Sequence, residues 1–560
     1  MTAAPATRSA TSPVTGGGTF TGTRPLLRLA LRRDRVKLPV WLAAVAVFHL
    51  VSARSVLALY PEAHDRVRLA VTSAVSSVAV VFNGLVSGTS PGAAVMSQTL
   101  LPTTVAAGFM NYLLVARHTR QNEETGRQEL LAAGVLGRRA ALTAALLLAL
   151  GADVVLCVLN LGVLVVAGLP AGPALLAAAA ISVAGLVLGA VAGVTAQVWE
   201  STRAAAAAAG AVLAVAFGLR AYGDTAGELV RHGTAIRPGP GSRLSPLGWA
   251  ELARPFDADQ WRWLLPGLVL SMALAVVAFA LVDRRDVGAG LFQPRTGRPR
   301  ATAFLGTPVG LAWRLQRTSL TAWAAGLAVT GLATGAGASQ ADSLLGSSKE
   351  TEQMIRDVAG GAGVSLADAY VGATFTFLGA VVAALGLLTV LRLHSEEADG
   401  HAEALLATGV GRVRWAMATV LVGLAAVLGA LVVCGAVTGL AWSLTSDVGA
   451  GALWRVTSAA LAQAPVALAL TAFGLLAFGL AGRAAATVSW SLFAACVVLG
   501  PLGSLLGLPA AVVDLSPLAH SPAAPAVAAS VGPQAVLCLV AVVLAGAGLG
   551  AFRRRDLDSR

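Results

Sequence analysis

Two acidic segments, each set between long apolar runs, carry the residues best spaced for chemistry with a partner. Residues three apart on a helix lie along one flank, so each segment presents carboxylates in a row with a glycine in the middle. Such a row can dock a basic surface of another protein, and the glycine allows its backbone to approach closely. The residues of the pattern are Glu123, Glu124, Gly126, Arg127 and Glu129 in the first segment, and Glu396, Glu397, Gly400 and Glu403 in the second.

A solvated helical loop, charged only to hold membrane topology, is the alternative reading of either segment. The spacing of Glu123, Gly126 and Glu129 recurs in the second segment, and this repetition favours docking. His401 stands where the first copy has Arg127, so the two docking sites need not be equivalent.

Motifs for catalysis are missing from the sequence. It contains no Gly-x-x-x-x-Gly-Lys-Ser/Thr loop for ATP phosphates, no His-Glu-x-x-His, no Gly-x-Ser-x-Gly and no Cys-x-x-Cys. The four cysteines lie apart within apolar runs and show no metal-site or disulfide spacing. We therefore predict a chain that is not an enzyme and that binds no metal or cofactor itself.

The composition is that of a membrane protein. Of the 560 residues, 56% are hydrophobic and only 12% are charged, and the mean hydropathy is +0.75. The net charge of +12 does not indicate nucleic-acid binding, because the arginines sit at the ends of apolar runs without a basic patch that also carries aromatic residues.

Twelve apolar runs are long enough to cross about 30 Å of hydrocarbon as helices. The run at 204–219 is short and rich in alanine, and the orientation of every later span depends on it. The expected spans are 38–59, 98–115, 141–167, 173–198, 204–219, 263–282, 320–338, 370–391, 415–442, 456–481, 488–508 and 534–551.

Matching motifs in the same order show that the chain repeats itself. Leu244–Leu247 recurs as Leu515–Leu518, and Arg284–Asp286 recurs as Arg554–Asp556. We expect an all-α polytopic protein of about twelve transmembrane helices, built as two parallel six-helix repeats. The expected parts are a disordered tail at 1–23, one six-span half at 24–287, a linker at 288–310 and the other half at 311–560.

Lysine and arginine are concentrated in alternate connecting segments, which places both termini and both acidic segments in the cytoplasm of a plasma-membrane protein. Before the first span of each half, arginines and a tryptophan predict paired interfacial elbow helices, in which arginine stems reach the headgroups. These residues are Arg32, Arg35 and Trp41 in the first half, and Arg314, Arg317 and Trp323 in the second. The segments 61–97 and 339–369 predict matching outer helices.

Titratable residues at bilayer depth are few. Asp153 and His49 lie within predicted spans, and the second half has nothing comparable. An ion-driven carrier needs such groups on its pathway, so the energy for any transport is expected to come from another chain.

Several motifs carry a family resemblance. Arg117–Arg120 running into the first acidic segment, the Glu-Glu of the second, Ser245–Trp249 and Arg284–Gly290 resemble the fused twelve-span permeases of tetronasin-type actinobacterial antibiotic exporters, within the ABC-2 class. The resemblance implies an ABC-type ATPase partner in two copies, with ATP and magnesium bound on that partner. It also implies coupling helices at the two acidic segments and export of a small hydrophobic or amphipathic compound through the lipid bilayer.

Two other functions are open at this stage. A major-facilitator-type carrier also has twelve spans in parallel halves, but its family does not explain the duplicated glutamate spacing or the acid-poor interior. A membrane scaffold or lipid-organising protein is the third alternative. A Walker-motif ATPase in the neighbouring reading frame would favour the first function over both.

Overall fold

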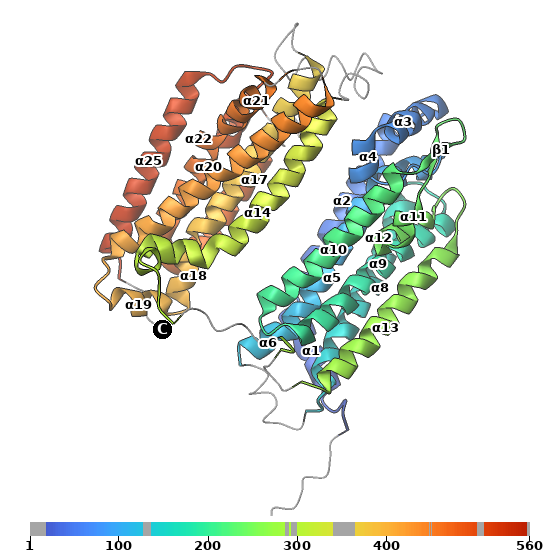
Figure 1. Cartoon of the computed structure of the whole chain (residues 1–560), viewed down its shortest axis with the longest axis horizontal. Helices are drawn as coiled ribbons and strands as arrows, with labels where there is room; N and C mark the ends of the chain where they lie inside the picture. The colour runs from blue at the N-terminus through green and yellow to red at the C-terminus, as the bar shows by residue number, and fades with distance from the viewer. Residues whose placement is uncertain are drawn as a thin grey trace, which may run out of the picture. The chain divides into compact units, whose positions relative to one another are not determined.

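The computed structural model describes residues 18–126, 136–285, 290–292, 299–339, 365–446, 449, 451–500 and 509–556. In these residues the chain is helical apart from short connections and an antiparallel pair of strands, β1 (Glu228–Val230) and β2 (Ala235–Arg237). It divides into two compact units, Met1–Thr296 and Gly297–Arg560, whose boundary falls within the predicted linker 288–310 (Figure 1).

The first unit is a bundle of long helices with short elements at both ends. The long helices are α2 (Lys37–Leu59), α5 (Pro91–His118), α8 (Ala140–Val166), α9 (Ala171–Val198), α10 (Thr202–Thr225) and α13 (Leu264–Val282). The short elements are α1 (Thr23–Arg33), α3 (Ala63–Val75), α4 (Ser77–Phe82), α6 (Arg120–Glu124), α11 (Pro240–Arg243), α12 (Pro246–Leu252) and η1 (Trp261–Trp263).

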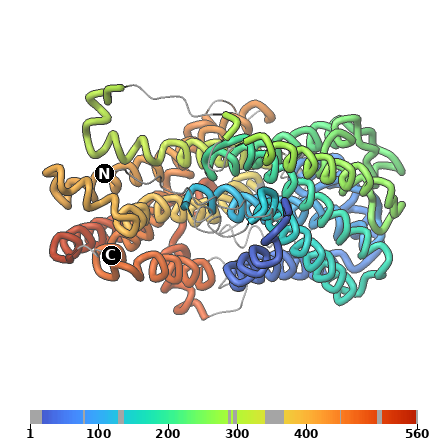
Figure 2. The backbone as a smooth tube through the Cα atoms, turned by 90° about the horizontal axis from the view of Figure 1, so that it is seen from below, coloured from blue at the N-terminus to red at the C-terminus, as the bar shows by residue number. Residues whose placement is uncertain are grey.

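The second unit is also a helical bundle, and within each unit the long helices run alongside one another in both views (Figure 1; Figure 2). Its long helices are α14 (Pro308–Ala338), α17 (Leu366–Val390), α20 (Arg412–Thr445), α22 (Ala464–Ala481), α23 (Ala485–Leu499) and α25 (Val531–Arg554). The short elements are η2 (Phe304–Gly306), α18 (Arg392–Ala398), α19 (His401–Leu406), α21 (Gly451–Leu461), η3 (Gly482–Ala484), α24 (Ala510–Val513) and η4 (Pro517–His520).

Each unit has a central helix rich in alanine and glycine. Helix α9 packs against α5, α8, α10 and α13, and α22 packs against α17, α20, α23 and α25. Small residues let the neighbours approach closely, as at Gly267 of α13, where an added Cβ would lie 2.5 Å from Val183 of α9. At Gly479 of α22 an added Cβ would collide with the carbonyl oxygen of Gly548 in α25.

Several helices begin at a hydroxyl residue followed by proline. The hydroxyl of Ser90 accepts a hydrogen bond of 3.1 Å from the backbone nitrogen of Ala93, and Thr307 caps α14 in the same way. The repeated Ser-Pro pairs have this role too, since Ser245 caps α12 and Ser516 caps η4. Proline fits the first helical turn because that turn needs no backbone donor there.

Eleven segments of the described chain are long and apolar enough to cross a membrane, as expected of an all-α polytopic protein. The alanine-rich run at 204–219 is one of them, as part of α10. The predicted spans 456–481 and 488–508 count as one of the eleven segments, because the 49-residue stretch Gly451–Leu499 contains the first and most of the second. That stretch is interrupted at η3, and residues 501–508 lie outside the described chain.

The two predicted outer segments are described unequally. In the first unit, α3 and α4 lie within the segment 61–97, where we expected an outer helix. Residues 340–364, the greater part of the corresponding segment in the second unit, lie outside the described residues.

Candidate functional site

The first acidic segment turns away from α5 at Thr119, and its leading glutamate lies inside the unit. The side chain of Glu123 is 5% exposed and accepts a hydrogen bond of 2.6 Å from Arg120. It also accepts two hydrogen bonds from Arg285, which follows α13: one of 2.8 Å from Nη1 and one of 2.5 Å from Nη2. The Nε of Arg285 donates to Gln197 at 2.6 Å, so the guanidinium is held from both sides.

The second acidic segment contains the equivalent arrangement. The side chain of Glu397 in α18 is 7% exposed and accepts a hydrogen bond of 2.6 Å from Arg555, which follows α25. The Arg555 guanidinium also lies over the rings of Phe478 and Phe552, at 5.3 and 5.9 Å from their centroids. Burial and the two aromatic faces orient this arginine toward the glutamate.

In each unit, a second arginine donates to the backbone carbonyl of the arginine that pairs with the glutamate. Arg138, which closes the first acidic segment, donates to the carbonyl oxygens of Arg285 and Val282. Arg412, which closes the second, donates to the carbonyl oxygen of Arg555 at 2.7 Å. We call Glu123–Arg285 and Glu397–Arg555 the anchoring pairs, because each joins an acidic segment to the end of the last long helix of its unit.

The anchoring pairs change what the two leading glutamates can do. Glu123 and Glu397 are buried and hydrogen-bonded within the chain, so they do not present free carboxylates to another protein. Nothing in the local sequence indicates the arginine partners. The only signal was that Arg284–Asp286 and Arg554–Asp556 are repeated, as the glutamates are.

The other acidic residues of the two segments are more accessible. Glu124 is exposed and accepts a hydrogen bond of 3.1 Å from the backbone nitrogen of Thr202 at the start of α10. Glu403 on α19 is exposed. Arg127 and Glu129, the remaining members of the predicted first site, lie outside the described residues.

Glu396 is half-buried beside the second anchoring pair. It forms an ion pair of 2.8 Å with Arg392, one helical turn earlier, and its other oxygen lies 3.2 Å from His401. The histidine that replaces Arg127 therefore faces a glutamate of its own segment.

The two glycines of the pattern have left-handed backbone conformations. Gly126 has φ of 68° and Gly400 has φ of 79°, and each follows the end of a short helix. Among the described residues, no atom lies within 4 Å of a Cβ built at either glycine. Each glycine is required by the turn that ends the helix, and the space beside it is open.

The predicted elbow residues occupy different settings in the two units. In the first, Arg32 lies in the separate helix α1, Arg35 follows it, and Trp41 lies exposed near the start of α2. In the second, the corresponding residues lie within one continuous helix of 31 residues, α14. These residues are Arg314 and Arg317, which are exposed, and Trp323, which packs against the core.

A buried aspartate links the elbow of the first unit to the end of α5. The side chain of Asp34 is 1% exposed, lies 2.8 Å from Arg117 and forms a hydrogen bond of 2.5 Å with His118. Sequence reasoning missed this contact, although an acid among so many arginines was a signal.

Sequence reasoning also missed an ionic cluster at the C-terminal end of α10. Arg220, whose side chain is fully buried, lies 2.7 Å from Asp224 and 2.8 Å from Glu251 of α12. It also donates to the carbonyl oxygens of Val80 and Val81, which end α4. Burial raises the pKa of the Glu251 carboxyl well above its usual range; Arg220 opposes this and Asp224 adds to it. An arginine and an acid one turn apart at the end of an apolar run were the available signal.

The polar residues at bilayer depth are buried and bonded within the first unit. His49 is 0% exposed and bonds Asn160 at 2.6 Å and Thr99 at 3.2 Å. Asp153 accepts a hydrogen bond of 2.8 Å from Asn111. Both residues are thus held among helices α2, α5 and α8.

Comparison with known proteins decides the family. The chain is 38% identical over 550 residues to the multidrug efflux system permease protein Rv1217c of Mycobacterium tuberculosis, with 98% of this chain and 97% of the relative covered. The chain belongs to this family of multidrug efflux system permeases. Residues 305–553 of the permease also match the family defined by the C-terminal domain of Rv1217c. That match begins shortly before α14 and ends within α25, so it covers most of the second unit of the permease.

Proposed function

We propose that this permease is the membrane subunit of an ATP-driven exporter, of the ABC-2 class, that moves hydrophobic or amphipathic drug-like compounds out of the cell. A separate cytoplasmic ABC-type ATPase, in two copies, binds ATP and magnesium and docks at the two acidic segments. The proposal includes twelve spans in two parallel six-helix repeats, a plasma-membrane location and cytoplasmic termini. The printed name of the relative, a multidrug efflux system permease, supports the substrate class.

The observation that carries the proposal is the pair of anchoring contacts. Glu123 joins α6 to Arg285, just beyond the end of α13, and Glu397 joins α18 to Arg555, directly after α25. Removing one partner of a buried ion pair costs about 3–5 kcal/mol. Because the pairs are costly to break, a displacement of the acidic segment would move the end of the long helix with it. A segment that receives the ATPase needs such a connection.

The surfaces left for docking are the exposed acids beside each pair. Glu124 in the first unit and Glu403 in the second can pair with lysine or arginine on the ATPase. No described atom lies within 4 Å of a Cβ built at Gly126 or Gly400, and this would let a partner approach the backbone of both turns. In this arrangement the leading glutamates hold the segment in place, and their exposed neighbours contact the partner.

The same central packing in both units supports the repeat. Two of the long helices that pack against α9 precede it in the chain and two follow it. The same is true of the long helices that pack against α22. The break at η3 allows the stretch Gly451–Leu499 to turn and cross twice, which would give the twelfth span.

The test is affinity purification, followed by reconstitution with the recovered ATPase. Affinity purification of the permease from detergent should recover the ATPase, and drug should stimulate ATP hydrolysis by the complex. Failure to recover any ATPase, together with transport by the permease alone on a proton gradient, would favour an ion-coupled carrier instead.

A further inference from the structure

We propose that a cavity in the second unit binds a neutral amphipathic molecule through a carbonyl, ester or ether oxygen. The oxygen accepts hydrogen bonds from Gln316 and Trp415, and an apolar chain or ring lies among the neighbouring leucines. The site would be where cargo, or a lipid that regulates transport, meets the permease. Only this purpose rests on the proposed function; the binding itself does not.

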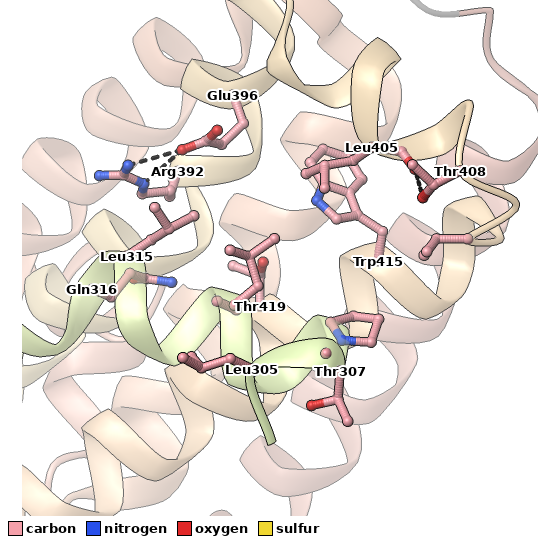
Figure 3. A pocket seen from close by; sticks show the side chains of 15 residues that line it. Leu305, Thr307, Leu315, Gln316, Arg392, Glu396, Leu405, Thr408, Trp415 and Thr419 are labelled. Carbon is pink, nitrogen blue, oxygen red and sulfur yellow. Dashed lines mark hydrogen bonds and ion pairs between the residues drawn. The ribbon is translucent and has the colours of Figure 1, made fainter. Parts of the chain in front are cut away.

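The cavity has a volume of about 240 Å³ and lies among the start of α14, the helices α18 and α19, and the start of α20 (Figure 3). Leu311 and Leu315 line one side, and Leu405 and Val410 line another. Ligand pockets for drug-sized compounds are usually about 300–1,000 Å³, so this cavity fits a compact molecule or one end of a larger one.

Two largely buried residues present polar groups to the cavity, and these groups have no partner in the described chain. Gln316 is 6% exposed and Trp415 is 7% exposed. Within the described part of the chain, neither the Gln316 amide nor the Trp415 indole nitrogen has a hydrogen-bond partner. Figure 3 shows both groups directed into the cavity from different helices. Both residues are largely buried, while their polar atoms are reached from the cavity, so an oxygen of a bound molecule can accept hydrogen bonds from them.

The charges at the cavity indicate that the molecule is neutral. Arg392 and Glu396 both line the cavity, but they form an ion pair of 2.8 Å with each other. His401 lies 3.2 Å from the same glutamate on its other side. Because the arginine and the glutamate balance each other, the cavity presents donors for hydrogen bonds without a net charge to neutralise.

The corresponding residues of the first unit take part in ionic contacts. In the repeat that aligns Trp41 with Trp323, Gln316 corresponds to Asp34, and in the repeat of the acidic segments Arg392 corresponds to His118. Asp34 and His118 are bonded to each other at 2.5 Å. The second unit has replaced this bonded pair with Gln316 and Arg392, which leaves the amide without a partner.

The glycines at the end of the two acidic segments, Gly137 and Gly411, also differ in how closely the described chain covers them. In the first unit, the backbone nitrogen of Gly137 donates to the carbonyl oxygen of Thr21 at 2.9 Å, so the N-terminal segment covers this turn. Its counterpart Gly411 has no atom of the described chain within 4 Å of an added Cβ. The covered glycine of the first unit and the uncovered glycine beside the cavity thus differ in the described chain.

A molecule in the cavity would touch the acidic segment directly. Glu396 is the neighbour of Glu397, which forms the second anchoring pair, and Leu405 lies on α19 beside the exposed Glu403. Occupancy would therefore be sensed where we place the docking of the ATPase.

Photolabelling of the full-length permease in nanodiscs tests the site without any ATPase. The probe is a monoacylglycerol whose acyl chain carries a diazirine, and labelled peptides are mapped by mass spectrometry. We expect labels within residues 305–316 and 405–419. Gln316→Leu keeps the size of the side chain but removes one neutral hydrogen bond, so half-saturation should need about three- to tenfold more probe.

Two further variants separate loss of binding from loss of folding. Ala312→Phe fills the cavity and should abolish labelling, whereas Thr321→Val, an exposed change on the same helix, should label as the wild type does. Gel filtration and melting temperature report whether each variant is folded. Equal labelling of the wild type and of a folded Gln316→Leu or Ala312→Phe variant would overturn the proposal.

Competition identifies the source of the ligand. Displacement of the probe by dioctanoylglycerol alone would indicate a lipid, and displacement by a neutral macrocyclic lactone would indicate cargo; either result supports the site. Labelling that neither compound reduces is non-specific and would contradict it. A positive result here, with no ATPase recovered in the earlier experiment, would refute the proposed function and leave the site standing.

Discussion

Glu123 and Arg285 are 162 residues apart in the sequence and are joined by two hydrogen bonds, of 2.8 and 2.5 Å. Glu397 and Arg555, 158 residues apart, repeat the contact in the second unit. In both cases an acidic segment is fixed to an arginine just beyond the end of a long apolar helix. The contact is therefore part of the repeated architecture, and its removal should affect the helix end as well as the segment.

Loss of one partner should destabilise the first unit strongly. Glu123→Leu removes the buried carboxylate that accepts hydrogen bonds from Arg120 and Arg285, which should cost about 3–5 kcal/mol and lower the melting temperature of the purified permease. Glu123→Leu combined with Arg285→Leu should be less destabilised than the sum of the two single variants. Strict additivity of the three melting shifts would show that the pair does not interact energetically.

Gly400 should tolerate a side chain poorly for conformational reasons alone. Gly400→Ala places a Cβ on a backbone with φ of 79°, at a cost of about 1–2 kcal/mol, although the space around it is open. Gly411→Ala is the matched control, because Gly411 has φ of −65° and equally open surroundings. The melting temperature should fall for the first variant only; equal effects would mean that the left-handed turn is not what selects glycine.

Charge reversal of the exposed acids should separate docking from folding. Glu124→Lys and Glu403→Lys change side chains that are exposed, so the melting temperature should be nearly that of the wild type. Recovery of the ATPase in affinity purification should fall sharply in the double variant. The control is Glu62→Lys, which reverses an exposed acid between α2 and α3. Normal recovery of the ATPase by the double variant would remove these residues from the docking surface.

The buried cluster of Arg220, Asp224 and Glu251 should make stability depend on pH. The pKa of Glu251 is raised in the folded protein, whereas an unfolded glutamate titrates near about 4.3. The stability contributed by this group is thus complete below that pH and is lost as the pH rises through the folded pKa. Relative to Glu251→Gln, the wild type should lose melting temperature as the pH rises above about 4.3. A difference between the two proteins that stays constant with pH would contradict the raised pKa.

The sequence predicted those features that depend on local pattern. Apolar runs predicted the long helices, including α10 with its alanine-rich run. Ser-Pro pairs mark helix starts such as Ser245 and Ser516. The repeated glutamates lie at one end of each unit. What they could not show was that Glu123 and Glu397 point inward, since their arginine partners lie far along the chain.

The elbow residues show a second limit of local pattern. Matching arginines and tryptophans precede the first span of both halves, yet only the first unit separates α1 from α2. In the second, Thr307 and Pro308 start a helix that continues without interruption to Ala338. The difference accompanies the exchange of Asp34, which bonds to α5, for Gln316, which bonds to nothing in the described chain. Such a tertiary contact cannot be read from residue spacing.

Transport by purified components tests the central claim most directly. The permease is reconstituted into inside-out proteoliposomes with and without the ATPase recovered by affinity purification, and uptake of an amphipathic drug is measured with ATP or with an imposed proton gradient. Uptake should require both the ATPase and ATP, and the Glu124→Lys, Glu403→Lys variant should abolish it. Uptake by the permease alone, driven by the proton gradient at the same rate with or without the ATPase, would contradict the account.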